Sequence, residues 1–545
     1  MLLLRALIVS SCALPIGQIS AQWAFSQGRI STSQSAEEGI GDMVINSLGH
    51  VIISGFTSSD VAFPPYQIDM DGAVSDFVVE YDAEGNVQSA MKLWTSYLGA
   101  PGYPWINGLA LDATDNLILG GDYNGDSLMW EDELILLNLG SGFTRSGYVT
   151  KLDAQGEPLW AVHFDHALVQ DVDVFTNGDV LAVGYDQYQR PMVVKLASLD
   201  GSILWQRNGN TGTGVISDVS VDELDRVHFS GVCTETFTLD GVLWCPFETV
   251  LGTSPSCWYT AVMNGNGSGE WYHVPDQDGG PWWGSGALVE ATSDGGQYVV
   301  TNNLVRFGSD TIAGGEHAGI YRLNADGTLD WARKMNSGSG LLAGSLTVDA
   351  QGAALVGAGA WGSSLDLTEV LLPLDILGTN IIIARYDEDG ALTGSCVGPV
   401  ISYGNCSVPA IAVDAQDMPV IGGRVTPWTG PPITMVFGSD SLVGDFANVF
   451  VAWTSAVALS AQDLEESDGL VIGPNPTRSL ISIRRNGGGV IGAVELMDGT
   501  GRIVMSGSST GNIATFDVSS LRAGIYFVRV SEHGSAQYMR ILVGI

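Results

Sequence analysis

The sequence predicts an all-β protein, a seven-bladed β-propeller followed by a small C-terminal β-sandwich. Three observations predict it. A ten-residue segment that reads as a turn followed by a strand recurs seven times between residues 46 and 423. Six short motifs with an Asp or Asn ahead of a Gly lie between alternating apolar strands. Residues 470–545 consist of further short alternating strands separated by Gly-containing turns.

The composition of the chain fits this class. Hydrophobic residues make up 45% of the 545 residues, which is enough to bury a core, and the 71 glycines indicate many turns. The formal net charge is −38, from 22 basic and 60 acidic residues. Such a surface repels phosphate backbones and excludes nucleic acid as a partner, whereas it suits a soluble extracellular protein and could attract cations or basic partners.

Residues 1–21 predict a secretory signal peptide. One Arg stands in an apolar run that ends on small residues, and we expect cleavage after Ala21. The alternative is lipid attachment at Cys12, because "VSSC" loosely fits a bacterial lipobox. No later stretch has 18 uncharged apolar residues, so no membrane span is predicted in the mature chain.

Five cysteines remain after the signal peptide, and outside the cytosol they are candidates for disulfides: Cys233, Cys245, Cys257, Cys396 and Cys406. We expect Cys396 and Cys406 to pair, because the bond would close a short loop and contribute roughly 2–3 kcal/mol. The pairing among the other three stays open, and one of them should be free. No C-x-x-C motif is present, and no metal site is predicted.

The ten-residue segment defines the repeat. Its copies end at Gly55, Gly121, Gly184, Gly231, Thr301, Ala358 and Gly423. A β pattern with a period of 47 to 70 residues is typical of a propeller or a related array. Each unit is predicted to form four strands, which in the second unit are residues 107–111, 116–121, 147–152 and 158–164. Because one such sheet cannot bury both faces, its neighbours must pack against it.

The Asp–Gly motifs are interpreted as hairpin turns. The Asp or Asn caps the turn and the Gly takes a left-handed conformation. The glycines are Gly85, Gly156, Gly201, Gly267, Gly327 and Gly390. "DEDG" at Asp387 superficially resembles a calcium loop, but no copy supplies the third ligand position or the Glu about six residues past the Gly that such a loop needs.

The seventh unit lacks a fourth strand, because it ends in "NVFVAWTSA" without a hairpin Gly after Trp453. The mature chain begins "QWAFSQG", which is similar to the fourth strands of other units. We therefore expect residues 23–27 to complete the seventh blade, so that the propeller comprises residues 22–457. This closure would remove an open sheet edge.

The stretch "KLWTSYLGAPGY" from Lys92, with "DFVVEYDAEGN" from Asp76, resembles the bacterial seven-bladed β-propeller repeat family. That family pairs a "DAF-V-KLD--G" strand with a "W-TYLGG" strand. The resemblance covers roughly residues 22–457 and is clearest in the first two units. The Trp-bearing strands also resemble quinoprotein-type propeller repeats, but nothing matches a quinone pocket, and no cofactor is expected.

An acidic linker is predicted at residues 458–469 and a β-sandwich domain at 470–545. This domain resembles the type A C-terminal sorting domain of the type IX secretion system. The resemblance implies passage through the periplasm, contact with the type IX machinery and export across the outer membrane of a Bacteroidota-type bacterium, with release or surface anchoring. The alternative is an ordinary adhesive sandwich. The matching residues are Pro474, Asn475, Pro476, Asp498, Gly501, Arg502, Leu521, Gly524, Ile525 and Tyr526.

The connections between the second and third strands are long in six of the seven units, and in a propeller they lie on one face. Two links between blades on that face are aromatic, "GAPGYPWING" and "DGGPWWGSG". The hypothesis is that these rings bind an extracellular polysaccharide or a surface protein. The alternative is that they pack between blades or support the loops. The candidate residues are Tyr103, Trp105, Trp282 and Trp283.

The predicted function is that of a secreted or cell-surface binding protein without catalytic activity, and the alternative is a secreted hydrolase or lyase on a propeller scaffold. His163 and His166 lie in or beside a fourth strand, where a packed or solvated role is favoured. No G-x-S-x-G or H-E-x-x-H motif occurs. The feature that would favour an enzyme is a convergence of carboxylates at the mouth of the central channel, with Arg or His among them.

Overall fold

The computed structural model describes two compact parts of the chain, Met1–Ser460 and Ala461–Ile545. The residues that it describes are 23–28, 38–58, 60–69, 74–97, 100–137, 145–211, 213–239, 242–245, 257–274, 287–302, 305–307, 310–313, 317–368, 371–374, 378–402, 404–427, 433–437, 440–444, 448–454, 470–473, 480–485, 491, 493–498, 502–508, 511, 513–522, 524–532 and 535–543.

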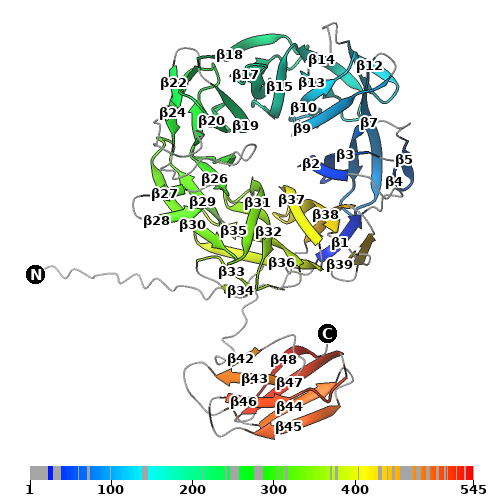
Figure 1. Ribbon diagram of the computed structural model, residues 1–545, viewed down its shortest axis with the longest axis vertical. Coiled ribbons are helices and arrows are strands. Elements are labelled where there is room, and N and C mark those ends of the chain that lie inside the picture. Colours follow the sequence, from blue (N-terminus) through cyan, green and yellow to red (C-terminus); the bar gives the residue numbers. More distant parts are fainter. Residues whose placement is uncertain are drawn as a thin grey trace, which may run out of the picture. The chain divides into compact units, whose positions relative to one another are not determined.

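Within these residues the first unit contains seven four-stranded antiparallel blades, arranged around a common centre (Figure 1). In each blade the strands are given from the centre outward. Blade 1 contains β2 (Glu38–Ile45), β3 (Val51–Thr57), β6 (Ser75–Tyr81) and β7 (Val87–Tyr97). Blade 2 contains β9 (Tyr103–Leu111), β10 (Leu117–Asn124), β13 (Ser146–Leu152) and β14 (Pro158–Phe164). Blade 3 contains β15 (Ala167–Val174), β16 (Val180–Asp186), β17 (Pro191–Leu196) and β18 (Ile203–Thr211).

The remaining blades follow the same order. Blade 4 contains β19 (Gly214–Val221), β20 (Val227–Cys233), β23 (Cys257–Met263) and β24 (Gly269–His273). Blade 5 contains β25 (Leu288–Ala291), β26 (Gln297–Thr301), β29 (His317–Leu323) and β30 (Leu329–Asn336). Blade 6 contains β31 (Gly340–Val348), β32 (Ala354–Trp361), β35 (Gly378–Tyr386) and β36 (Leu392–Ser402). Blade 7 contains β37 (Gly404–Val413), β38 (Pro419–Pro427), β41 (Asn448–Thr454) and β1 (Trp23–Gly28).

The ring closes as the sequence predicts. The N-terminal strand β1 pairs antiparallel with β41, so that Phe25 lies opposite Trp453. This pairing gives blade 7 its fourth strand from the other end of the propeller chain, and the edge of β41 is covered.

The hydrophobic core is divided among the junctions between blades. Each of seven buried clusters contains side chains from two neighbouring blades, because a four-stranded sheet has two apolar faces to cover. In ring order from blades 1 and 2 to blades 7 and 1, representative pairs are Leu93 and Tyr148, Phe164 and Val194, Phe175 and Phe229, Trp258 and Tyr321, Tyr298 and Ile382, Leu355 and Phe450, and Trp453 and Phe77.

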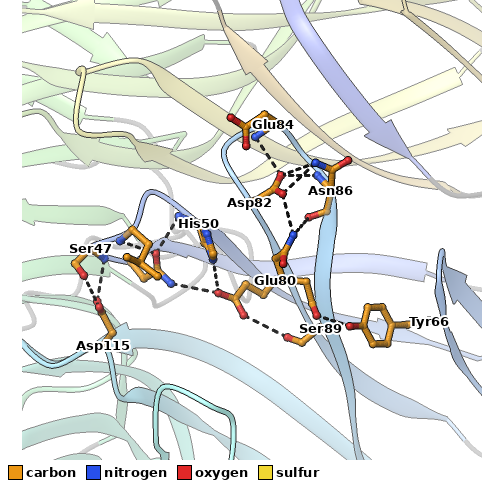
Figure 2. Close-up of polar contacts among 12 residues, drawn as sticks. Ser47, His50, Tyr66, Glu80, Asp82, Glu84, Asn86, Ser89 and Asp115 are labelled. Carbon is orange, nitrogen blue, oxygen red and sulfur yellow. Dashed lines mark hydrogen bonds and ion pairs between the residues drawn. The ribbon is translucent and has the colours of Figure 1, made fainter.

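The Asp–Gly motifs are hairpin turns, as predicted. All six glycines have positive φ, between 69° and 85°. In the last copy Asp387 Oδ1 accepts the backbone N–H groups of Asp389 (3.1 Å) and Ala391 (2.7 Å). Figure 2 shows the same arrangement in the first copy, where Asp82 accepts from Glu84 and Asn86. The acidic side chain therefore holds the turn.

Four of the six turns have a second role that the sequence did not indicate, since each of them receives a Trp from the preceding blade. In blades 2 to 5 the fourth-strand Trp donates its indole N–H to a carbonyl in the next hairpin: Trp160 to Ser198, Trp205 to Gly265, Trp271 to Ala325 and Trp331 to Glu388, at 2.7–3.2 Å. A Cβ on Gly390 would lie 2.5 Å from the ring of Trp331, so the Gly also makes room for the indole.

A different turn links neighbouring blades through an aspartate in the left-handed region. Asp225 has φ 60°, and its Oδ1 accepts the N–H (2.8 Å) and the hydroxyl (2.9 Å) of Thr176 in the preceding blade. Asp115 and Asp417 have φ 59° and make the equivalent contacts at two other junctions. Figure 2 shows Asp115 against Ser47. These carboxylates offset a strained backbone conformation with bonds between blades.

The long connections contain strands of their own, which the sequence did not indicate. Each of the six contains a hairpin, and three of these hairpins extend the outer edge of the preceding blade: β11 (Ser127–Trp130) pairs with β7, β21 (Phe237–Leu239) with β18, and β33 (Ser364–Asp366) with β30. Their partners are β12 (Glu133–Leu137), β22 (Val242–Cys245) and β34 (Leu371–Pro373). The other hairpins are β4 (Val61–Phe63) with β5 (Tyr66–Ile68), β27 (Val305–Phe307) with β28 (Asp310–Ala313), and β39 (Ile433–Phe437) with β40 (Asp440–Gly444). Exposed edges are thereby paired.

The expected bond between Cys396 and Cys406 is not formed, because both thiols are free and buried. Cys396 lies on the outer strand of blade 6 and Cys406 on the inner strand of blade 7, so closeness in sequence does not make them strand partners. Burial raises the pKa of both thiols. Cys233 is disulfide-bonded. The side chains of Cys245 and Cys257 lie outside the described residues.

The C-terminal unit consists of two antiparallel sheets that share one core. The first contains β42 (Leu470–Gly473), β43 (Leu480–Arg485) and β46 (Ile513–Asp517). The second contains β45 (Ile503–Ser508), β44 (Ala493–Asp498), β47 (Gly524–Glu532) and β48 (Ser535–Val543). Ile481 and Phe516 of the first sheet and Leu496 and Val528 of the second belong to one buried cluster. Two sheets with interleaved inner faces form a sandwich.

Gly390→Ala should destabilise the protein more than Gly338→Ala. Both glycines have positive φ (76° and 73°), so both variants pay about 1 kcal/mol for a left-handed Ala. Only the new methyl at position 390 also meets an indole, whereas nothing lies within 4 Å at position 338. Urea unfolding of the full chain measures the difference. Equal effects would mean that contact with Trp331 does not constrain the turn.

Substitutions of Asp225 should rank in a defined order of stability, with Asn above Gly and Gly above Ala. Asn tolerates the left-handed backbone and keeps an acceptor for Thr176, Gly keeps only the backbone freedom, and Ala keeps neither. We expect Asp225→Ala to lose about 2 kcal/mol. Thermal unfolding of the three variants gives the ranking, and an Ala variant as stable as the Asn variant would contradict the proposed link.

Candidate functional site

A cavity of about 540 Å³ lies at the centre of the ring, and it is lined by the innermost strands of all seven blades. The strands that contribute are β2, β9, β15, β19, β25, β31 and β37. Irregular pairing occurs in the inner strands at Asp42, Asp171 and Asp218, where the chain bulges against the second strand. A bulge redirects a side chain, which is how an acidic residue within an apolar strand comes to line the cavity.

Five acidic side chains line this cavity: Asp42, Asp171, Asp173, Asp218 and Glu290. Three of them bond to the inner strand of the next blade at 2.6–2.8 Å: Asp42 accepts the N–H of Leu109, Asp171 that of Val219, and Asp173 that of Val221. Asp218 accepts the N–H of Val289 in the same way (2.5 Å), and Glu290 accepts the hydroxyl of Ser220 (3.0 Å). The carboxyls therefore connect blades as well as lining the cavity.

Burial raises the pKa of every one of these groups. The pKa is about 6 for Asp42 and Asp173, about 7 for Asp218 and about 8 for Glu290, and that of Asp171 lies well above its usual value. The backbone hydrogen bonds oppose this rise, and the neighbouring carboxylates add to it because like charges disfavour ionisation. At neutral pH the group is thus partly protonated.

The cavity is lined by carboxyl groups without a cationic side chain. Among its described lining residues there is no Lys, Arg or His. The convergence of carboxylates that would favour an enzyme is therefore present, but the accompanying Arg or His is not among those residues. In the described part of the chain, no group of three or more His, Cys, Asp or Glu is arranged to hold a metal ion.

The predicted aromatic residues are placed differently from expectation. Tyr103 and Trp105 lie at the start of β9 rather than in a link, because the chain enters blade 2 earlier than its Gly and Pro residues suggest. Their rings stack with centroids 6.0 Å apart and planes at 27°. Tyr103 is 46% exposed, whereas Trp105 is half-buried. Trp282 and Trp283 lie outside the described residues.

The ring of Trp105 is already in contact with another side chain of the protein. The guanidinium of Arg145 lies 4.1 Å from its ring centroid, and Arg145 Nε donates to the buried carboxylate of Asp122 (2.5 Å). A second bond to Asp122 comes from Asn107 (3.1 Å). Trp105 therefore acts as a support, and Tyr103 and Arg145 are the more exposed members of the cluster.

The two histidines that the sequence analysis considered, His163 and His166, have contacts within the protein. His163 Nδ1 lies 3.0 Å from the hydroxyl of Tyr123, and burial lowers the pKa of His163. His166 occupies the turn after β14 with φ 56°, and its Nε2 lies 3.5 Å from Asp165. Both arrangements agree with the packed or solvated role expected for them.

The sorting-signal residues are described in part. Tyr526 is buried in the core of the sandwich and donates its hydroxyl to the carbonyl of Arg522 (2.9 Å), and Gly524 begins β47. Arg502 immediately precedes β45. Pro474, Asn475, Pro476 and Gly501 lie outside the described residues.

The five acidic residues of the central cavity, called the channel carboxyls from here on, are the feature that sequence reasoning missed. Their signal is present, since "GDMVI", "QDVDV", "SDVSV" and "LVEA" each place an acid in a predicted first strand. Such an acid reads as a solvent-facing position of an alternating strand until a ring brings the inner strands together.

Asp218→Asn should raise the free energy of unfolding at pH 8 by on the order of 2 kcal/mol and leave it nearly unchanged at pH 4. The folded-state pKa of Asp218, about 7, lies above the unfolded value of 3.8, so its contribution is present below pH 4 and is lost as the pH rises through 7. Asn keeps the acceptor for Val289.

The matched control is Asp389→Asn, which removes the same charge from an exposed turn. Chemical denaturation between pH 4 and pH 8 measures both variants. If the exposed substitution flattened the pH profile as much as Asp218→Asn, the effect would be one of net charge and not of the channel.

Comparison with known proteins identifies the C-terminal unit. Residues 471–544 match the family model of the secretion system C-terminal sorting domain. The search of curated proteins found no match to the chain. Among the described residues no helix is long and apolar enough to cross a membrane.

Solved structures, a propeller among them, are similar at low identity. The Dos1 propeller has a TM-score of 0.40 and 9% identity, and the alignment covers 80% of this chain and 95% of that one. A catalytically inactive virginiamycin B lyase from Staphylococcus aureus has a TM-score of 0.37 and 10% identity, with 78% and 98% covered. PorZ of Porphyromonas gingivalis, a surface component of the type IX secretion system, has a TM-score of 0.17 and 10% identity, with 95% and 100% covered.

The blades, the closing strand and the matched tail lead to one conclusion. The protein carries a propeller ahead of a secretion system C-terminal sorting domain, through which the type IX secretion machinery exports it to the cell surface or the extracellular space.

Proposed function

We propose that the propeller is a non-catalytic binding domain that recognises an extracellular polysaccharide. Export to the cell exterior supports this proposal, because it places the domain where such polymers are present. The observation that carries it is the exposed ring of Tyr103, which is supported from behind by Trp105. An aromatic face that is exposed and rigidly held is suited to stack on the apolar face of a sugar.

The polar groups beside this ring suit the hydroxyl groups of a sugar. Arg145 is fixed by Asp122 through its Nε, and its side chain is 44% exposed. Asn124 Oδ1 accepts the backbone N–H of Tyr103 and holds the start of β9 against the end of β10 (2.5 Å). One aromatic ring and a few oriented donors are the usual composition of a small recognition site.

Tyr103→Ala should lower the affinity for a bound polysaccharide by about threefold to tenfold, the equivalent of one aromatic contact. Tyr272→Ala is the control, since Tyr272 is a comparably exposed tyrosine (40%) on the outer strand of blade 4. A panel of soluble and insoluble polysaccharides, tested by pull-down and calorimetry with the full chain, identifies the ligand. Binding that is unchanged in Tyr103→Ala, or equally weakened in Tyr272→Ala, would contradict the proposal.

A second candidate function is acid-assisted cleavage of a polymer in the central cavity. The observation that favours it is the raised pKa of Glu290, about 8, which keeps a carboxylic acid protonated beside Asp42 and Asp173, both with a pKa of about 6. Carboxyls with separated pKa values can divide the roles of acid and base. Glu290→Gln would abolish turnover of a cleaved substrate, and an unaffected rate would exclude this function for the cavity.

A further inference from the structure

His228 is enclosed between blades 4 and 5. Its side chain is 0% exposed and lies on β20. Nε2 lies 3.3 Å from Asp222 Oδ2, in the turn that precedes β20, and Nδ1 lies 3.1 Å from Gln297 Oε1, the first residue of β26 in blade 5. Both ring nitrogens thus have a partner, one from each blade.

The partner of Nε2 can only accept. The pKa of Asp222 is held at about 2, because hydrogen bonds from His228 and Arg226 outweigh the effect of burial. Asp222 is therefore a carboxylate throughout the neutral range. Its Oδ1 already accepts the N–H groups of Leu224 (2.9 Å) and Arg226 (2.8 Å), and its Oδ2 accepts Arg226 Nε (2.7 Å).

The partner of Nδ1 can only accept as well. Thr260 donates its hydroxyl to the carbonyl of Phe229 (3.0 Å), so its oxygen accepts from Gln297 Nε2 (2.5 Å). This bond fixes the orientation of the amide and directs Gln297 Oε1 toward His228. Two acceptors at the two ring nitrogens require a proton on each nitrogen.

Other blades show what this histidine replaces. In blade 2 the third-strand residue Lys151 pairs with the turn residue Asp112 (2.8 Å), and in blade 6 Arg385 pairs with Asp349 (2.5 Å). The strand register places Lys151 opposite Ile118 and Arg385 opposite Leu355. In blade 4 the two residue types are reversed. The third-strand position that holds Lys151 or Arg385 in the other blades holds Val262, and the opposite second-strand position holds His228. The turn carboxylate of blade 4 thus faces an imidazole where blades 2 and 6 supply a Lys or an Arg.

The other charged groups around His228 come from both blades. Arg226 shares Asp222 with it, and Glu290 reaches the neighbouring strand through Ser220, which lies opposite His228. In blade 5, Asp294 in the turn before Gln297 pairs with Arg322 (2.6 Å). Arg322 also pairs with Asp330 of the same blade, whereas Asp222 contacts Arg226 and His228.

We infer that His228 is held as a buried imidazolium in the native protein and acts as a proton-dependent link between blades 4 and 5. Loss of one proton leaves either the carboxylate of Asp222 or the amide oxygen of Gln297 facing a ring nitrogen without a hydrogen. A buried acceptor that loses its donor is destabilising, so the junction weakens as the pH rises.

The protonation state can be measured directly. In the full chain labelled with ¹⁵N-histidine, the signals of His228 are assigned by their loss in His228→Gln, or by substitution of the other six histidines if that variant does not fold. We expect both ring nitrogens of His228 to show the shifts of a protonated imidazolium at neutral pH. One protonated and one unprotonated nitrogen would overturn the inference.

The link itself is tested by giving this junction the residues of blades 2 and 3. The triple variant His228→Ile, Val262→Lys and Gln297→Val introduces the residues that stand at the same register positions as Ile118, Lys151 and Val180. Hydrogen exchange is followed in β20 and β26, with β10 of blade 2 as the internal reference.

In the wild type we expect β20 and β26 to lose about tenfold more protection than β10 as the pH rises, which is the loss of one hydrogen bond to a charged group. In the triple variant the three strands should respond alike. The channel carboxyls also weaken the fold at high pH, so the difference between the two proteins isolates His228. The same response of β20 and β26 in both proteins would overturn the link.

Discussion

The structure depends on the sharing of cores between neighbouring sheets. A four-stranded antiparallel sheet has two apolar faces and no layer of its own to cover them. In this protein each face packs against the next blade, and the seven interblade clusters form a closed series because β1 joins β41. Without that pairing blade 7 would end in an open edge at β41.

Several polar contacts, like the apolar clusters, join neighbouring blades. Three kinds of polar link pass from one blade to the next: the indoles onto the hairpins, the turn aspartates onto the preceding turn, and channel aspartates onto the next inner strand. The channel carboxyls are both structural and electrostatically costly, since the bonds that tie β15 to β19 also gather like charges around one cavity. Net stability here is a balance between hydrogen bonds between blades and repulsion across the ring.

Much of the fold could be predicted from the sequence because its signals are local. The left-handed Gly390, the capping Asp387 and the alternation of the strands act within ten residues, and the repeat of these features implies the array. The sorting domain was predictable from spaced motifs, and its family match confirms it. The predicted disulfide between Cys396 and Cys406 was wrong because it depends on tertiary structure. The two residues are ten positions apart, yet one lies on an outer strand and the other on the inner strand of the next blade.

The sequence by itself determined the strand order, the hairpin chemistry, the closing strand and the export signal, because each depends on neighbouring residues or on a repeat. Only the tertiary structure decided which acids meet in the channel, which blade receives each indole, and that Trp105 supports Tyr103 instead of facing solvent. It also decided that three of the long connections pair with sheet edges and that His228 lies between Asp222 and Gln297. The physical reason is that these relations join residues from different blades, and their distances exist only once the ring has closed.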